Sequence, residues 1–299
     1  MSTTGNVRVV AVGSQLLRVS VRPGRQRRRG GGSRQPPLLL MNGIGASLEL
    51  LQPFVDQLDP AIEVIRFDVP GVGGSLLPAR PYRFTGLCAL AAGLLTELGH
   101  EHADVLGISW GGGLAQHFAA VQSTRCRRLV LVSTATGALM VPARPSVLAK
   151  MATPRRYLNR GYLEQIAPDI YGGSARTDPA SVAAAMNSDN RVGSGRGYLY
   201  QLAAGAGWTS IPFLPLLRQP ALIVSGDDDP IIPLANARIL HRLIRGSRLH
   251  VFHGGHLALV TQAAELAPVI SAFLTEPDLA APRPHRGPGA AVRATAMRG

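Results

Sequence analysis

The stretch that most constrains this chain is DVLGISWGGGLAQHFAA, residues 104–120, in which an apolar run meets glycines around Ser109 and a helical pattern follows. Gly107, Ser109 and Gly111 fit the pattern G-x-S-x-G. In this motif a sharp strand-to-helix turn strains the serine backbone, and the hydroxyl projects from the edge of a sheet. The stretch therefore predicts a nucleophile at Ser109. The alternative is an ordinary turn whose serine caps the helix.

Strand and helix patterns alternate along most of the 299 residues. Such alternation predicts an α/β fold, with a mostly parallel sheet that helices cover on both faces. A β-hairpin opens the chain, because alternating residues 7–12 and 16–22 flank the turn GSQ. Further strands are expected at 38–42, 63–68, 103–108, 128–134, 220–226 and 248–255, and helices at 48–58, 84–98, 110–122, 234–244 and 261–274.

Regularity fades over residues 137–212, which mix helical pieces with prolines and glycines. Because this block lies between two regular runs, we expect a mainly helical cap inserted into a core of residues 1–136 and 213–276. Within the core, GRQRRRGGGSRQP at 24–36 predicts a flexible basic loop. The polar, proline-rich residues 277–299 predict a disordered basic tail.

The formal net charge of +13 raises the question of a nucleic acid partner. Most of the excess lies in the loop at 24–36 and the tail at 277–299, and the rest of the chain is mildly basic. We therefore expect no nucleic acid partner, with a polyanion or an anionic surface at the loop as the alternative. Two cysteines without metal-like spacing indicate a reduced compartment. With no signal peptide pattern and no membrane span, the expectation is a soluble cytoplasmic protein.

A serine nucleophile needs a base and a group that orients the base, in the chain order Ser, Asp or Glu, His. The strand at 220–226 ends in GDDDPIIP. Three adjacent carboxylates repel one another, so at least one should have a role other than solvation. We choose Asp229 as the acid, with Asp228 as the reserve. Turn formation is the alternative role of Asp227 and Asp228.

The last expected strand ends in FHGGHLALV. His256 follows two glycines and precedes a helix, so its ring is able to reach across the sheet edge toward Ser109. We therefore assign His256 as the base. His253 lies three residues earlier, at the strand end, and is interpreted as a structural or surface histidine.

Acyl transfer also requires hydrogen-bond donors for the developing oxyanion. The candidates are the backbone N–H of Trp110, which opens the helix after Ser109, and that of Ile44 in the loop NGIG (42–45). An ordinary βα loop is the alternative for NGIG. No phosphate-binding loop and no zinc-spaced Cys/His cluster is found, so no cofactor and no metal are implied.

The pieces NGIG, FDVPGVGGS, GISWGG, GDDDPIIP and GGHLALV resemble, in their order, the α/β-hydrolase superfamily over residues 7–276. The chain further resembles the intracellular poly(3-hydroxyalkanoate) depolymerases that act on medium-chain-length storage polyester. That resemblance rests on Trp110 and on three stretches, LMVPARPSVLAKMATPRRY (139–157), IAPDIYGG (166–173) and GRGYLYQLAAGAGWTSIPFL (195–214). It places the nucleophile on Ser109, the acid on Asp229 and the base on His256. The basic loop and tail depart from the family and leave subunit number and granule contacts open.

The resemblance implies hydrolysis of a hydrophobic polyester or acyl ester through an acyl-enzyme, with release of 3-hydroxy acids or short oligomers, in contact with storage granules. Four cap aromatics are expected either to line an apolar groove or to form the cap core: Trp208, Phe213, Tyr198 and Tyr200. The alternatives in the same class are a general carboxylesterase and a meta-cleavage C–C bond hydrolase. A non-catalytic hydrolase-fold binding protein is the alternative from another class, against which the intact triad argues.

Overall fold

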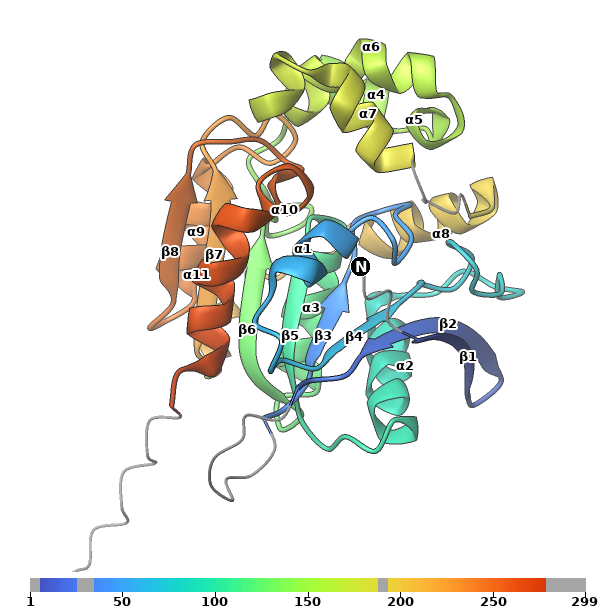
Figure 1. Cartoon of the computed structure of the whole chain (residues 1–299), viewed down its shortest axis with the longest axis vertical. Helices are drawn as coiled ribbons and strands as arrows, with labels where there is room; N and C mark the ends of the chain where they lie inside the picture. Colours follow the sequence, from blue (N-terminus) through green and yellow to red (C-terminus); the bar gives the residue numbers. More distant parts are fainter. Residues whose placement is uncertain (1–5, 26–34, 188–192, 278–299) are drawn as a thin grey trace, which may run out of the picture.

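The computed structural model describes residues 6–25, 35–187 and 193–277. Within these ranges eight strands form one sheet in the order β1-β2-β4-β3-β5-β6-β7-β8 (Figure 1). β2 is antiparallel to β1 and to β4, and the other neighbouring strands are parallel. The strands are β1 (Asn6–Val12), β2 (Gln15–Arg22), β3 (Leu38–Met41), β4 (Val64–Phe67), β5 (Ala103–Ile108), β6 (Cys126–Val132), β7 (Ala221–Gly226) and β8 (Arg248–Phe252). The mostly parallel sheet and the opening hairpin are confirmed.

Helices cover both faces of the sheet, as predicted (Figure 1). Successive residues of β3 divide between two hydrophobic cores, because side chains alternate along a strand: Leu38 and Leu40 belong to one core, and Leu39 and Met41 to the other. The first core includes α1 (Gln52–Gln57), α10 (Ala258–Thr261) and α11 (Ala263–Thr275), and the second includes α2 (Phe84–Glu97), α3 (Trp110–Val121) and α9 (Ala235–Leu243).

Most boundaries agree with the sequence prediction to within one or two residues, and three differences have an evident physical reason. The helix expected at 48–58 begins only at Gln52, because Pro53 fits the first turn of a helix and not its interior. The helix expected at 261–274 begins at Ala263 as α11, and a separate short helix, α10, precedes it; Gln262 separates the two, with a backbone that is not helical and a side chain that donates to the His253 carbonyl at 2.9 Å. The last strand ends at Phe252 instead of 255, which leaves residues 253–255 free to turn toward the site.

The segment predicted as a cap, 137–212, is mainly helical. It contains α4 (Pro145–Met151), α5 (Arg155–Leu158), α6 (Arg160–Tyr171), η1 (Gly173–Arg176), α7 (Pro179–Asn187) and α8 (Gly195–Gly205). Helices α4 to α7 lie together above the end of the sheet toward which the parallel strands point (Figure 1). A bridge between Gly137 and Thr209 joins the two ends of the segment. The exact domain boundaries stay a prediction, and most of the predicted basic loop and tail lies outside the described residues.

Asp68, at the end of β4, ties together the loops that follow β3 and β4. Its side chain is fully buried and accepts hydrogen bonds from the Leu48 amide at 2.7 Å and the Gly74 amide at 2.8 Å. It also pairs with the Arg18 guanidinium of β2 at 3.0 Å. One carboxylate therefore fixes two loops at the edge of the sheet where Ser109 emerges.

We expect Asp68→Ala to lower the free energy of unfolding by about 3–5 kcal/mol, because the buried Arg18 guanidinium and two backbone amides lose the carboxylate to which they bond. Asp56→Ala is the matched control, since Asp56 is an exposed aspartate on α1 that bonds only Gln52 among the described residues. The control should cost no more than about 0.5 kcal/mol. Urea denaturation followed by circular dichroism measures both, and equal losses in the two variants would contradict this role for Asp68.

Candidate active site

Ser109 lies at the turn between β5 and α3 with a backbone that non-glycine residues rarely adopt. Its φ is 55° and its ψ is −121°. Its N–H donates to the Val132 carbonyl at 3.0 Å, and its own carbonyl accepts from the Thr134 hydroxyl at 2.7 Å. The Ser109 side chain makes no capping hydrogen bond to α3. The alternative of a capping serine is therefore wrong, and the hydroxyl is free to face the neighbouring cavities.

The glycines of the motif are required by close packing. A Cβ on Gly107 would lie 2.3 Å from the Gly111 carbonyl oxygen, and a Cβ on Gly111 would lie 2.2 Å from the Met41 carbonyl oxygen of β3. Contacts this short leave no room for any side chain. The start of α3 thus packs directly against the ends of β5 and β3, which holds Ser109 in its strained conformation.

His256 and Asp229 form a buried pair at the same edge of the sheet. The His256 Nδ1 lies 2.8 Å from Asp229 Oδ2, and the two side chains are 6% and 0% exposed. The other carboxylate oxygen of Asp229 accepts from the amides of Ile231 and Ile232, at 2.9 Å each. With the carboxylate as the acceptor, this contact requires the proton of the hydrogen bond on Nδ1. That tautomer leaves Nε2 with a lone pair, as a general base requires.

The other two aspartates of GDDDPIIP have different partners. Asp228 bonds the Arg176 guanidinium at 2.6 and 2.7 Å and the Gly173 amide at 2.7 Å, so it joins the core to η1. The hydrogen bond from Arg176 lowers the pKa of Asp228. Asp227 pairs at 3.1 Å with His253, whose side chain is 94% exposed, and this hydrogen bond lowers the pKa of Asp227. His253 therefore lies at the surface, and neither carboxylate is paired with His256.

Ser109 and His256 line one small cavity of about 30 Å³. The loop from Asn42 to Ile44 forms another part of its wall. The remaining walls include three residues from the segment 137–212 that sequence reasoning missed: Arg156, Tyr157 and Tyr171. The stretch PRRY, which contains the first two, gives no signal that one arginine is buried and its neighbour exposed.

The two predicted oxyanion donors, the backbone amides of Ile44 and Trp110, differ from the neighbouring amides in their hydrogen bonding. The amides of Gly43 and Gly45 donate to side-chain oxygens, at 2.9 and 2.7 Å. Among the described residues, no protein acceptor takes the amide of Ile44 or that of Trp110. Gln201 of α8 accepts from the Gly45 amide and, through its carbonyl, from the Trp110 indole at 2.8 Å. The assignment of the two donors stays a prediction, but α8 holds both loops in register.

A sequence profile of the alpha/beta hydrolase fold family matches residues 36–263. The chain belongs to the α/β-hydrolase family. It is 49% identical to a poly(3-hydroxyalkanoate) depolymerase from Ectopseudomonas oleovorans, over 94% of this chain and 97% of that protein. A 2-hydroxymuconate semialdehyde hydrolase from Pseudomonas sp. (strain CF600) is 30% identical over 82% of this chain and 89% of its own length. The crystal structure of an enol-lactonase from Burkholderia xenovorans LB400 matches 90% of this chain with a TM-score of 0.75 and 26% identity.

A second, larger cavity of this α/β-hydrolase also touches Ser109. It has a volume of about 350 Å³ and an apolar wall that includes Phe84, Trp110, Met140 and Trp208. Of the four cap aromatics named from the sequence, Trp208 alone lines it among the described residues, and Tyr198, Tyr200 and Phe213 lie elsewhere. The hydrolase therefore places Ser109 between a small cavity that contains His256 and a larger apolar one.

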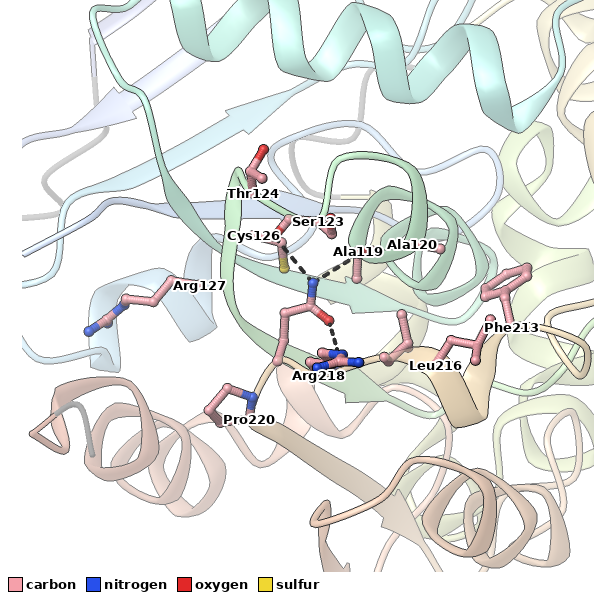
Figure 2. Close-up of a pocket in the computed structure, with 12 residues that line it drawn as sticks. Ala119, Ala120, Ser123, Thr124, Cys126, Arg127, Phe213, Leu216, Arg218 and Pro220 are labelled. Atoms are coloured by element: carbon pink, nitrogen blue, oxygen red, sulfur yellow. Dashed lines mark hydrogen bonds between the residues drawn. The ribbon is translucent and has the colours of Figure 1, made fainter. Parts of the chain in front are cut away.

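An open hollow of about 510 Å³ lies at the other end of the sheet, where β6 and β7 begin (Figure 2). Gln219 lines it and donates to the carbonyls of Ala119 and Ser123, at 2.9 and 3.3 Å. Burial raises the pKa of the Cys126 thiol, so this sulfur stays protonated and is a poor nucleophile. The described wall of this hollow offers no activated nucleophile.

We expect Asp229→Asn to lower kcat on p-nitrophenyl octanoate by about 10³- to 10⁴-fold, because the amide no longer selects the histidine tautomer that accepts the serine proton. Asp228→Asn is the matched control and should change kcat by less than about threefold, since Asp228 bonds η1 and not His256. Steady-state kinetics on both variants decides between the two aspartates. A large loss confined to Asp228→Asn would reverse the assignment.

Proposed function

We propose that this hydrolase is a serine esterase that cleaves the ester bonds of medium-chain-length poly(3-hydroxyalkanoate) and releases 3-hydroxy acids or short oligomers. The observation that carries the proposal is the place of Ser109 between the cavity that contains His256 and the 350 Å³ apolar cavity. A polyester of alkyl-bearing units needs both, one beside His256 for a polar group next to the reacting ester and one for the alkyl chain. The 49% identity to a depolymerase over nearly the whole chain supports the same substrate class.

In the proposed mechanism Ser109 Oγ attacks the ester carbonyl while His256 Nε2 takes its proton. Asp229 stabilises the imidazolium that forms, and the amides of Ile44 and Trp110 donate to the oxyanion of the tetrahedral intermediate. His256 then gives the proton to the leaving alkoxide, which departs as the hydroxyl end of one product. Water, activated by His256, hydrolyses the acyl-enzyme and frees the acid.

The proposal places the protein in the cytoplasm, at the surface of storage-polymer granules. In the described residues no helix is long and apolar enough to cross a bilayer. Several large apolar side chains of the segment 137–212 are exposed, among them Leu139 at 63%, Leu158 at 65% and Leu199 at 56%. Exposed apolar groups above the site suit an enzyme whose substrate is a hydrophobic solid.

We expect the wild-type protein to release free 3-hydroxyalkanoic acids from amorphous medium-chain polyester granules, and Ser109→Ala to abolish this release because the attacking oxygen is gone. Liquid chromatography with mass spectrometry measures the acids. His253→Ala is the control, since His253 is exposed and lies outside the pair with Asp229; it should keep activity.

Other outcomes of that measurement have different consequences. Ser109-dependent cleavage of a soluble ester without release from granules would keep the serine esterase and reject the polymer substrate. Cleavage of a dienoic keto-acid in preference to esters would favour the C–C bond hydrolase instead. Loss of neither activity in Ser109→Ala would reject the nucleophile.

We expect Gly205→Leu to shift the preference of the enzyme toward shorter acyl chains. Gly205 lines the apolar cavity, and a Cβ there would lie 3.5 Å from the Trp110 indole nitrogen, an ordinary contact. The added leucine should therefore fill space without displacing the backbone. The ratio of kcat/KM for decanoyl over butyryl p-nitrophenyl esters should fall about tenfold.

Gly86→Leu is the matched control for this shift, because Gly86 is exposed on α2 and nothing lies within 4 Å of a Cβ there. It should leave the decanoyl-to-butyryl ratio unchanged. An unaltered ratio in Gly205→Leu would show that acyl chains do not occupy this cavity.

A further inference from the structure

Arg156 of α5 is buried without a carboxylate. The residue is 1% exposed. Its Nη1 donates to the Tyr198 hydroxyl at 2.9 Å and to the carbonyls of Met151 and Thr153, both at 3.4 Å. Its Nε has no hydrogen-bond partner among the described residues. A charge removed from water without an opposite charge costs several kcal/mol.

Two other buried arginines, Arg18 and Arg22, make contacts that stabilise the fold. Arg18 pairs with Glu49 and Asp68. Arg22 donates to the carbonyls of Val55, Leu58, Asp59 and Ile62, which closes the turn after α1. Arg156 has no carboxylate partner, unlike Arg18. It also differs from Arg22, which donates from both Nη1 and Nη2, because its hydrogen bonds come from Nη1 and two of the three are 3.4 Å long. Two tyrosine rings, of Tyr157 and Tyr198, lie 4.6 and 5.4 Å from its Cζ and partly stabilise the charge.

Tyr171, at the end of α6, carries a second unused donor at the same place. Its side chain is buried, and its hydroxyl has no hydrogen-bond partner among the described residues. Burial raises the pKa of this phenol, so the hydroxyl keeps its proton near neutral pH. Its ring stacks on that of His256, with 6.4 Å between centroids and 12° between planes, and its carbonyl accepts the His256 amide at 2.8 Å. The donor therefore lies beside the proposed catalytic base.

We propose that Arg156 and Tyr171 form an anion subsite for the terminal carboxylate of the polyester, so that the enzyme cleaves from the carboxyl end. This inference rests on the proposed function. Both residues line the 30 Å³ cavity that also contains Ser109 and His256. That volume suits one small polar group, since a single water needs about 10–15 Å³. On an otherwise neutral polyester, the carboxyl terminus is the one group whose charge matches an unpaired guanidinium.

The chemistry fits the position of the subsite. In a chain of 3-hydroxy acids the terminal carboxylate lies one CH₂ and one CH away from the oxygen of the last ester bond. A carboxylate held by Arg156 thus presents that ester to Ser109. Attack breaks the bond between the carbonyl carbon and the alcohol oxygen, forms the bond to Ser109 Oγ, and releases one 3-hydroxy acid after His256 protonates its oxygen. Hydrolysis of the acyl-enzyme then gives the shortened chain a new terminal carboxylate.

The test compares two forms of one substrate, the ester dimer of 3-hydroxyoctanoate with a free carboxylate and the same dimer with a neutral carboxamide. Wild-type enzyme should cleave the internal ester of the free acid with a kcat/KM about 10- to 100-fold higher, the range expected for hydrogen bonds to a charged group. Arg156→Met, which keeps the length and removes the charge, should bring this ratio to about 1. Tyr171→Phe, which removes only the hydroxyl, should lower the ratio about three- to tenfold.

Arg155→Met is the matched control, because Arg155 precedes Arg156 on α5 but is exposed, with its guanidinium over the Tyr162 ring at 4.2 Å. It should keep the wild-type ratio. The proposal is overturned if wild-type enzyme does not prefer the free acid, if Arg156→Met keeps the preference, or if Arg155→Met loses as much. A preference for a free 3-hydroxyl over its acetate, independent of Arg156, would assign recognition to the other chain end. If Arg156→Met does not fold, Arg156→Lys and Tyr171→Phe provide the comparison.

Binding to an inactive enzyme separates this inference from the proposed function. In the Ser109→Ala background, calorimetry should find that 3-hydroxyoctanoate binds about 10- to 100-fold more tightly than its amide, and that Arg156→Met removes the difference. If granules are not hydrolysed and this difference is still found, the depolymerase function fails and the subsite stands. If granules are hydrolysed and no difference is found, the subsite fails and the depolymerase function stands.

Discussion

The contact between the start of α3 and the ends of β3 and β5 is the constraint on which the site depends. Gly107 and Gly111 allow the backbones to approach so closely that no side chain fits between them. Ser109 consequently takes a positive φ, which costs of order 1–3 kcal/mol and persists only because the surroundings determine it. The position of Ser109 is therefore fixed by the packing of backbone atoms, and the other residues of the site are arranged around it.

The parallel sheet then brings residues far apart in the chain to one edge. Ser109 follows β5, Asp229 follows β7 and His256 follows β8. Because β5, β7 and β8 are parallel, their carboxyl ends lie at the same edge of the sheet. Ligands of open α/β sheets bind at that edge. The three adjacent aspartates after β7 each pair with a different side chain: Asp227 with His253, Asp228 with Arg176 and Asp229 with His256. The three neighbouring carboxylates thus lie in different surroundings: Asp227 at the surface, Asp228 against η1 and Asp229 beside His256.

The sequence was sufficient for the fold class and for the order of strands and helices, because hydrophobic periodicity and glycine turns are local signals. It also indicated Ser109, Asp229 and His256, since each follows a strand in a recognisable turn. The choice between Asp228 and Asp229 could not be settled by spacing, because it depends on Arg176, 52 residues away. Arg156, Tyr171 and Gln201 were missed for the same reason. The contact of Gln201 with Gly45 joins residues 156 positions apart, and no local pattern encodes it.

The segment 137–212 adds to the proposed triad a distinction between the two sides of Ser109. It contributes Met140 and Trp208 to the large apolar cavity, and Arg156 and Tyr171 to the small cavity that contains His256. In the proposed binding mode, an ester between them is held by different forces at its two ends, burial of alkyl surface on one side and charge on the other. Binding that fixes orientation lowers the barrier by removing unproductive arrangements of the reactants. A buried guanidinium that destabilises the free enzyme is therefore compatible with faster turnover, provided the substrate, and not the protein, brings its counter-charge.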